Sequence, residues 1–386
     1  MQVILRLNFL RVAFLLSGVL LLVNCGGPAG GGQPVGSGGN GNSSEFLYAA
    51  TTVQGSGQTM GAIMAFPIDS ATGALGTATT VAGPDSASSI LANPAGTFLF
   101  VDDDTNLKAD IFSISNSGSL GAISGSPFST GVDATGLAMD PGGKFLYIAS
   151  ASSSTVSAYT VNASSGALTA ISGSPFAAGS GASAAVVDPS GKFLFVSDSL
   201  DSTGGISAFT INSSSGALTS IAGSPFATAV NGEPVALTVA PSGKFLYAGE
   251  SLGGGIFGLA ISAGGSLTAI QASAFDPLDR PASFAIDPGG KFLFAANSTS
   301  STIGVFTIDS STGALTAISG SPFSVSTAPS RLAIDSTGAF LYASNSTAGT
   351  ITGFNINKST GALTAFSGTP YAAGIQPQNL TVVTLP

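Results

Sequence analysis

Apolar and small or polar residues alternate in short stretches along the chain from residue 45 onward. In the stretch 283–287 (SFAID), Phe284 and Ile286 alternate with small or polar residues. A PGGK turn follows, and the stretches 292–297 (FLFAAN), 302–309 (TIGVFTID) and 314–320 (ALTAISG) complete the unit. Alternation with a period of two is typical of half-buried β-strands. The pattern therefore predicts four antiparallel strands joined by short turns.

The same unit recurs seven times with two anchors in register. Intervals between the first anchors run from 47 to 52 residues. A strand-rich period of this length indicates the blades of a β-propeller. The first anchor, the phenylalanine of FLY or FLF, falls at Phe46, Phe98, Phe145, Phe193, Phe245, Phe292 and Phe340. The second, the glycine of GAL or GSL, falls at Gly73, Gly118, Gly166, Gly216, Gly265, Gly313 and Gly361.

The two ends of the repeat predict how the ring closes. The first unit begins directly at EFLYAAT (45–51) and lacks an initial strand, whereas a surplus strand, PQNLTVVTL, follows the last unit at 377–385. Because that strand can complete the first blade, we expect a closed, all-β, seven-bladed propeller of four-stranded antiparallel blades. The turns of the DPSGK and SSTGAL type belong on one face of the ring, and the variable loops on the other, which we call the loop-rich face.

The repeated pattern DPSGKFLY, TI.VF.ID, TGALT and GSPF resembles the seven-bladed lactonase-type propellers. That family includes one class of 6-phosphogluconolactonase and the fungal muconate-lactonising enzymes. The resemblance covers residues 45–385 and rests on turn and packing positions, so it implies the fold more directly than an activity. The muconate-lactonising members use a histidine with Glu and Arg, and this chain has no histidine, so no catalytic residue is carried over.

Composition excludes several classes of function. Only 8% of the residues are charged, the formal net charge is −9, and histidine and tryptophan are absent. Without a basic stripe the chain has nothing to neutralise phosphates along a strand, so we expect no nucleic-acid partner. Without histidine, Ser-His-Asp and Cys-His catalysis are impossible. We expect a monomer.

The first 44 residues predict export. Arg6 and Arg11 precede an apolar run at 12–23, and Cys25, the single cysteine, follows. Such a run is typical of a secretory signal and short for a bilayer span. The stretch 22–25 (LVNC) resembles a lipobox, although Asn24 stands where a small residue is usual. We expect a signal peptide at 1–24, a Gly-rich tether with lipidated Cys25 at 25–44, and the propeller at 45–386. The alternative is an ordinary signal peptide with a chance cysteine.

Charged residues at irregular positions fall on the loop-rich face, where binding and chemistry usually lie. Glu233, Arg280 and Arg331 each stand at or just before the start of an inner strand. An Arg there can hold a carboxylate, and a Glu can act as a general base. The three residues are our catalytic candidates; the alternative is that they are loop charges paired locally or solvated.

A second candidate is a calcium loop at 101–110 (VDDDTNLKAD). Asp102, Asp104, Asn106 and Asp110 occupy positions 1, 3, 5 and 9 of the calcium-loop template. Leu107 replaces the turn glycine and Ser113 the bidentate glutamate, so a solvated acidic loop is the competing interpretation. No other cofactor is expected.

Two functions follow from these observations. The first is a membrane-anchored lipoprotein of the bacterial cell envelope, periplasmic or at the surface, whose propeller binds or scaffolds a protein, glycan or small molecule through its loop-rich face. The alternative is an active lactonase, a carboxylic ester hydrolase similar to 6-phosphogluconolactonase. The missing histidine favours the first, and the enzyme question stays open.

Overall fold

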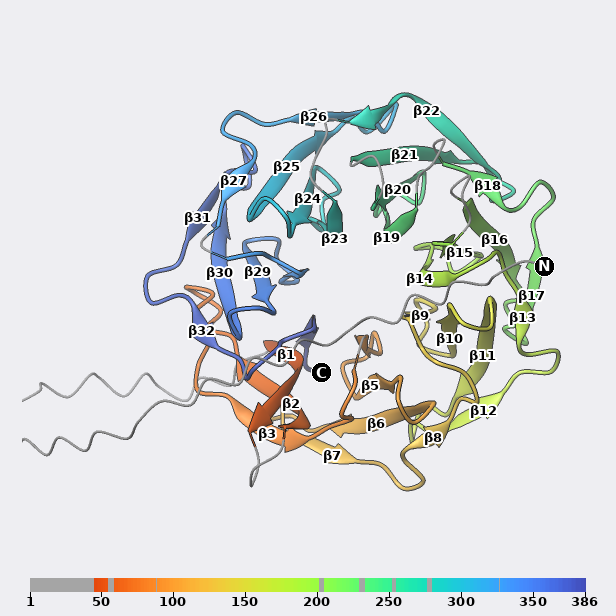
Figure 1. Ribbon diagram of the computed structural model, residues 1–386, viewed down its shortest axis with the longest axis horizontal. Coiled ribbons are helices and arrows are strands. Elements are labelled where there is room, and N and C mark those ends of the chain that lie inside the picture. The colour runs from red at the N-terminus through yellow and green to blue at the C-terminus, as the bar shows by residue number, and fades with distance from the viewer. Residues whose placement is uncertain are drawn as a thin grey trace, which may run out of the picture. The chain divides into compact units, whose positions relative to one another are not determined.

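The computed structural model describes residues 45–54, 59–87, 89–200, 205–228, 233–251, 255–275, 280–325 and 327–386. Seven antiparallel sheets stand around a central axis, as predicted (Figure 1). The predicted signal peptide, the tether and Cys25 lie outside the described residues. Residues 42–386 form one compact unit that holds every strand. In the part of the chain described, no helix has the length and apolarity needed to span a membrane.

Each blade has the same four strands, counted from the axis outward. The innermost are β33 (Asn379–Thr384), β4 (Ile90–Ala92), β9 (Gly136–Met139), β14 (Ala182–Val187), β19 (Pro234–Val239), β23 (Pro281–Ile286) and β28 (Arg331–Ile334). The second strands are β1 (Glu45–Gln54), β5 (Phe98–Asp103), β10 (Phe145–Ser150), β15 (Phe193–Asp198), β20 (Phe245–Glu250), β24 (Phe292–Asn297) and β29 (Phe340–Asn345).

The outer half of each blade carries the remaining strands. The third strands are β2 (Thr59–Pro67), β6 (Lys108–Ile114), β11 (Thr155–Val161), β16 (Gly205–Ile211), β21 (Ile256–Ile261), β25 (Thr302–Ile308) and β30 (Thr350–Ile356). The fourth strands are β3 (Thr79–Ala82), β7 (Leu120–Ala122), β12 (Leu168–Ala170), β17 (Leu218–Ser220), β22 (Leu267–Phe275), β26 (Leu315–Ala317) and β31 (Leu363–Ala365).

The predicted ring closure is confirmed. The C-terminal strand β33 pairs with β1, so blade 1 is built from both ends of the propeller. Glu45 secures this join: its Oε1 accepts hydrogen bonds from the Ser336 amide of blade 7 and from Thr384 Oγ1, both at 3.0 Å. The Glu45 carboxylate therefore links the start of β1 to the end of β33 and to the first turn of blade 7.

The GSPF segments add a short returning strand to five blades, which the sequence pattern did not predict. After each short fourth strand in five blades, a cis proline turns the chain back to the third strand, where two more residues pair with it. In blade 3 the Ser174 hydroxyl, just before this proline, accepts a hydrogen bond from the Ala158 amide at 2.8 Å. The returning pairs are β8 (Phe128–Ser129), β13 (Phe176–Ala177), β18 (Phe226–Ala227), β27 (Phe323–Ser324) and β32 (Tyr371–Ala372).

The two anchors of the repeat meet at the boundaries between blades. Gly216 of blade 4 has a positive φ of 73°, and a β-carbon there would lie 2.4 Å from the Phe145 ring of blade 3. Only glycine meets both conditions at little cost. Tyr147 strengthens the same boundary by donating its hydroxyl to the Gly216 carbonyl at 3.0 Å. Phenylalanine and glycine therefore recur together because each blade packs its phenylalanine on the next blade's glycine.

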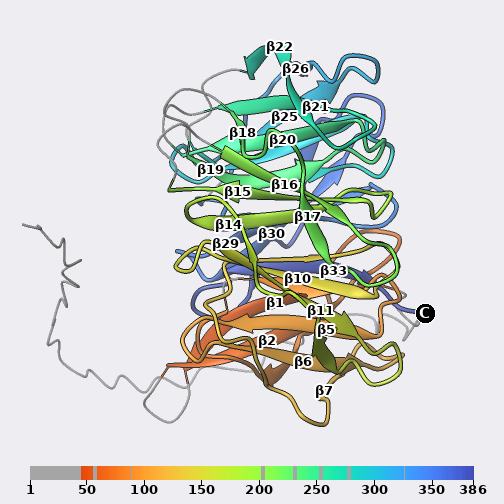
Figure 2. The same ribbon diagram turned by 90° about the vertical axis from the view of Figure 1, so that its right-hand side faces the viewer.

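The turns and loops segregate to opposite faces of the ring, as predicted. Lys144, after the first turn of blade 3, donates to the carbonyl of Ser214 in the last turn of blade 4, at 3.0 Å. Both types of short turn therefore lie on one face, which we call the short-turn face. The strands run from this face to the loop-rich face, as the side view shows (Figure 2).

Candidate functional site

The innermost strands all start at the loop-rich face and surround the axis. Neighbouring inner strands contact each other around the whole ring. Glu233 directly precedes β19, Arg280 directly precedes β23, and Arg331 begins β28. The three predicted residues thus stand at the same end of three consecutive inner strands, in blades 5, 6 and 7.

Glu233 is half-buried and has a defined partner. Its Oε2 accepts a hydrogen bond from Ser251 Oγ at 3.0 Å, and its carbonyl accepts one from the Ser251 amide at 2.9 Å. Buried Glu250 ends β20 close by and is the cross-strand partner of Pro234. Blade 5 therefore carries two carboxylates, Glu233 and Glu250, at the loop-rich ends of β19 and β20.

Arg331 is half-buried on the wall formed by blades 6 and 7. Its Nη1 donates to the Ala282 carbonyl at 3.2 Å and to the Ser330 carbonyl at 3.0 Å. Burial lowers its pKa from the ordinary value, but a guanidinium stays protonated at neutral pH because its pKa starts above about 12. The structure holds this cation against two backbone carbonyls, without a carboxylate partner among the described residues.

Arg280 is placed differently. It is exposed, and its φ of +56° lies in the left-handed region, which a residue with a β-carbon seldom occupies. Arg280 thus combines an exposed side chain with a left-handed backbone conformation just before β23. Arg280 and Arg331 lie on neighbouring blades but differ in burial, so only Arg331 has a position set by packing.

Buried polar residues recur near the loop-rich ends of the second strands, and most of them were not predicted as site residues from the sequence. The residue five positions after each anchor phenylalanine is polar in all seven blades, which was the available signal. Six of these residues end the second strands at the loop-rich face, whereas Thr51 lies within β1, which continues to Gln54. Alternation does not single them out, because several have polar neighbours, as Asp103 has Asp102 and Asp104. The buried polar residues are Thr51, Asp103, Ser150, Asp198, Glu250, Asn297 and Asn345.

Asp133 adds a hydroxyl-bound carboxylate in blade 3. Its Oδ1 accepts hydrogen bonds from the Ser150 hydroxyl and, at 2.5 Å, from Ser152 Oγ. Burial raises the pKa of this carboxyl, but the hydrogen bonds from Ser150 and Ser152 outweigh burial and lower it overall. Asp133 is thus held ionised, which suits it to positioning rather than to taking up a proton.

The four residues of the predicted calcium loop do not converge. Asp102 pairs across the sheet with Ala109 and Asp110 with Val101, so these two carboxylates point to opposite faces of blade 2. Asn106 donates its side-chain amide to Asp103 at 2.8 Å instead. Among the described residues no group of three or more His, Cys, Asp or Glu side chains is arranged to hold a metal ion.

Two further details of this loop bear on the calcium hypothesis. Leu107 has a φ of +55°, so it adopts the left-handed conformation for which the template uses glycine. Burial, and then the charge of Asp103, raise the pKa of Asp110, which disfavours the ionised form that a cation would need. Asp104 stays in the connecting turn, where its amide donates to the Ser86 carbonyl. Calcium binding by Asp102, Asp104, Asn106 and Asp110 stays a prediction.

A family model named "Lactonase, 7-bladed beta-propeller" matches residues 46–172 and 155–326 of this chain. The two matches overlap and together span most of the propeller. This protein belongs to the seven-bladed lactonase family. The resemblance inferred from the DPSGKFLY and GSPF patterns is thereby confirmed.

Solved structures show the same fold as this lactonase-family propeller at low sequence identity. A candidate 6-phosphogluconolactonase from Bacteroides fragilis is 21% identical, with a TM-score of 0.75, over 89% of this chain and 99% of that one. The periplasmic gluconolactonase of Pseudomonas aeruginosa is 19% identical, with a TM-score of 0.74, over 89% of this chain and all of that one. No curated protein sequence matches this chain.

The chain belongs to the lactonase family but contains no histidine. The chain offers Glu, Asp and Arg at the mouth, and no imidazole to move protons. A hydrolytic site in this member therefore needs a general base other than histidine, and a carboxylate can take that role. Glu233 and Glu250 are the described carboxylates whose positions match that requirement most closely.

Proposed function

We propose that this protein is an exported lactonase that opens a sugar lactone at the loop-rich mouth of its channel. The single observation that supports this most is that Glu233 directly precedes the inner strand of blade 5 and Arg331 begins the inner strand of blade 7, at the same end of a lactonase-family propeller. Relatives of the same fold include a periplasmic gluconolactonase and candidate 6-phosphogluconolactonases. The substrate class proposed here is accordingly a lactone of an aldonic acid.

Hydrolysis at this mouth needs a base and a cation. In the proposed step Glu233 takes a proton from water while the water oxygen bonds to the lactone carbonyl carbon. Arg331 stabilises the negative charge that builds on the carbonyl oxygen. The bond from that carbon to the ring oxygen then breaks, and the proton passes from Glu233 to the departing oxygen, which yields the hydroxy acid. Ser251 keeps Glu233 oriented throughout.

The direct test is hydrolysis of D-glucono-1,5-lactone and of its 6-phosphate by residues 42–386, measured against the rate in buffer. We expect Glu233→Gln to lower the enzymatic rate by about 100-fold or more, the usual contribution of a general base. Arg331→Met should cost about as much as one oxyanion donor, roughly 100-fold. Asp309→Asn on the short-turn face is the matched control, because Asn212 occupies the same position in blade 4. Rates equal to buffer with every lactone would overturn the proposal.

Export and lipid attachment through Cys25 form a separate part of the proposal. Support comes from the arginines and the apolar run that precede the single cysteine. We expect the full chain to partition with the membrane fraction and the Cys25→Ala variant to be released. A variant that stays with membranes would show that the anchor is wrong, while leaving the lactonase proposal intact.

A binding role for the loop-rich face is the second candidate function, and one observation favours it. Among the described residues, the large hydrophobic side chains that remain exposed all lie on this face: Met60, Leu107, Leu200, Val235 and Ile375. Exposed apolar groups gathered on one face are typical of a contact surface. If no lactone is turned over, Leu200→Ser and Ile375→Ser should weaken retention of a partner by the immobilised propeller.

A further inference from the structure

The boundary between blades 4 and 5 differs from its neighbours on the short-turn face. Lysine follows the first turn in four consecutive blades, at Lys144, Lys192, Lys244 and Lys291. In blades 3 and 6 it bridges to the last turn of the next blade: Lys144 Nζ donates to the Ser214 carbonyl at 3.0 Å, and Lys291 Nζ to the Ser359 carbonyl at 2.8 Å. Each ammonium also lies over its neighbouring phenylalanine ring, 4.7 and 4.8 Å from the centroid.

The last turn of blade 5 is one residue shorter than that of blade 4. In blade 4 the Gly216 amide donates to the Asn212 carbonyl, four residues back, whereas in blade 5 the Gly265 amide donates to the Ser262 carbonyl, three residues back. The shortened turn does not supply the carbonyl that a lysine of blade 4 would reach. Within the described chain, Lys192 makes no side-chain hydrogen bond, ion pair or ring contact.

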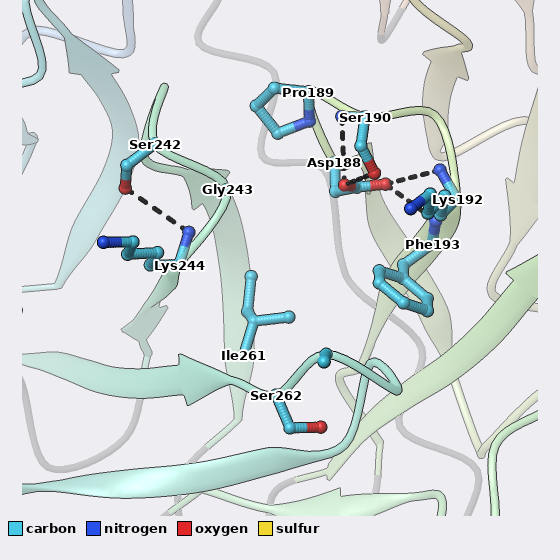
Figure 3. Close-up of a pocket in the computed structure, with 11 residues that line it drawn as sticks. Asp188, Pro189, Ser190, Lys192, Phe193, Ser242, Gly243, Lys244, Ile261 and Ser262 are labelled. Atoms are coloured by element: carbon cyan, nitrogen blue, oxygen red, sulfur yellow. Dashed lines mark hydrogen bonds between the residues drawn. The ribbon is translucent and has the colours of Figure 1, made fainter.

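A hollow of about 580 Å³ opens where the longer turn would have been. The first turn of blade 4 forms one side and the first turn of blade 5 the other, with Ile261 and Ser262 between them (Figure 3). Lys192 stands on the blade 4 side. Lys244 extends from the opposite turn, away from Asp188 (Figure 3).

The hollow is positively charged overall because two lysines and only one carboxylate line it. Asp188 accepts hydrogen bonds from the amides of Ser190, Lys192 and Phe193, at 3.0, 2.8 and 2.7 Å, and from the Ser190 hydroxyl at 2.5 Å. Blade 5 has Ala240 where blades 3, 4 and 6 have an aspartate, so its turn adds no second carboxylate. The rim of the hollow thus has two lysines, Lys192 and Lys244, and one carboxylate whose oxygens already accept hydrogen bonds from its own turn.

The hydroxyls of the hollow are also free to donate. Ser242 Oγ accepts a hydrogen bond from the Lys244 amide at 3.3 Å, and Ser262 Oγ accepts one from the Ser266 amide at 3.0 Å. Since a hydroxyl that accepts still has its own hydrogen to give, each serine can donate to a ligand. Two ammonium groups and two hydroxyl donors are the complement of a group with several negative oxygens.

We propose that this hollow binds a phosphate group, as a free phosphosugar or as part of a phosphate-bearing envelope component. A tetrahedral dianion uses all four donors, and lysine binds phosphate as a point charge on a flexible stem that can turn toward it. The site lies on the face opposite the proposed lactonase mouth. Its role is therefore attachment or recognition, and it stands whether or not the lactonase proposal does.

The test is calorimetric titration of residues 42–386, at constant ionic strength, with inorganic phosphate, D-glucose 6-phosphate and D-glucose. We expect the two phosphates to bind saturably and glucose not to bind. The Lys192→Met, Lys244→Met double variant should weaken phosphate binding at least tenfold. The Lys144→Met, Lys291→Met double variant removes the same charge from the same face and should bind as the wild type does. Equal losses in both double variants, or no saturable binding at all, would overturn the proposal.

A second variant keeps both lysines and changes only the turn. Replacing residues 262–265 (SAGG) with the blade 4 sequence NSSSG should fill the hollow, give Lys192 a carbonyl and abolish phosphate binding. Unchanged binding in this variant would contradict the site. Cosedimentation with phosphatidylglycerol vesicles, against phosphatidylcholine vesicles, identifies the source: binding to the anionic vesicles with the same variant dependence supports the site with a lipid headgroup as its ligand.

Discussion

The two faces of the ring are built from the same strands and follow opposite rules. On the short-turn face every blade repeats one contact, a phenylalanine packed on the positive-φ glycine of the next blade. On the loop-rich face the loops differ in length and charge from blade to blade, and buried polar residues replace the apolar contacts. Packing that must close a ring tolerates little variation, whereas loops beyond it are free to vary and to carry chemistry.

Blade 5 departs most clearly from the repeated sequence on the short-turn face. It lacks the turn aspartate, has the shortened last turn, and has AIQASAF where most blades have a GSPF segment. Departures from the repeat on the short-turn face thus coincide with the hollow at its boundary with blade 4. In a repeat protein, the positions that break the repeat are the first place to look for function.

The largest effect is expected from the anchor glycines. Gly216→Ala meets a φ of +73° and the Phe145 ring, whereas Gly131→Ala on the loop-rich face meets a φ of +72° and no atom within 4 Å. The left-handed conformation alone costs about 1–2 kcal/mol, and overpacking adds about 1–3 kcal/mol. We expect Gly216→Ala to lower the free energy of unfolding by about 3 kcal/mol, which is roughly twice the loss expected for Gly131→Ala.

Urea denaturation of the two variants measures this difference. The shared φ makes Gly131→Ala the matched control, so any excess loss in Gly216→Ala reports the contact between blades. Equal losses would show that the phenylalanine and glycine recur together for some reason other than packing.

The ring closure is expected to come next in size. Glu45→Ala removes a buried carboxylate that accepts from Ser336 and Thr384. Hydrogen bonds to charged groups contribute about 1.5–3 kcal/mol each, and the cost of burying the carboxylate offsets part of the two bonds, so we expect a net loss of about 2 kcal/mol in unfolding free energy. Thr384→Val removes one bond and keeps the carboxylate, and should cost about half as much. A Glu45→Ala protein as stable as wild type would mean that β33 pairing alone closes the ring.

The sequence predicted the short-turn face far better than the loop-rich face. The phenylalanine and glycine anchors, the turn aspartates and the surplus strand at 377–385 repeat or complete a pattern, so their places follow from periodicity. Asp140 does cap its turn, accepting from the Lys144 amide at 2.7 Å. The hydrogen bond from Lys144 to Ser214 of the next blade could not be predicted, because the pattern within one blade carries no information about contacts with its neighbour.

The candidate site was predicted only in part. Glu233, Arg280 and Arg331 could be placed at the mouth because each stands at the start of an inner strand. The buried polar residues Asp198, Asn297 and Asn345 needed the positions of neighbouring blades to be recognised. Spacing within one loop does not give side-chain direction: the positions of Asp102 and Asp110 fit a calcium template, and strand alternation sends their side chains to opposite faces of blade 2.

A smaller effect is expected from the tyrosines at the blade boundaries. Tyr147→Phe removes one buried hydrogen bond to the Gly216 carbonyl, which should cost about 1 kcal/mol. Burial raises the pKa of this tyrosine above its ordinary value, so the hydroxyl is protonated and able to donate at neutral pH. Phe195 occupies the same place in blade 4, so the fold accepts the substitution. Urea denaturation with an unchanged midpoint would show that the bond adds nothing to the aromatic packing.

The smallest effect belongs to Asp133 on the loop-rich face and depends on pH. Hydrogen bonds from Ser150 and Ser152 lower its pKa against the opposing effect of burial. Because the folded-state pKa is depressed, the ionised carboxylate stabilises the protein above its unfolded-state pKa of about 4, and that stabilisation is lost as pH falls through the folded-state value. With solvent screening we expect Asp133→Asn to lower the free energy of unfolding at pH 7 by about 0.5 kcal/mol.

That loss should shrink as the pH is lowered toward 3, because the wild-type carboxyl then becomes protonated too. Urea denaturation of both proteins across this range measures it. Asp309→Asn is the control on the short-turn face, where asparagine already serves in blades 3, 4 and 7 at Asn162, Asn212 and Asn357. A difference between wild type and Asp133→Asn that stays constant with pH would mean that the two serines recognise the shape of the side chain rather than its charge.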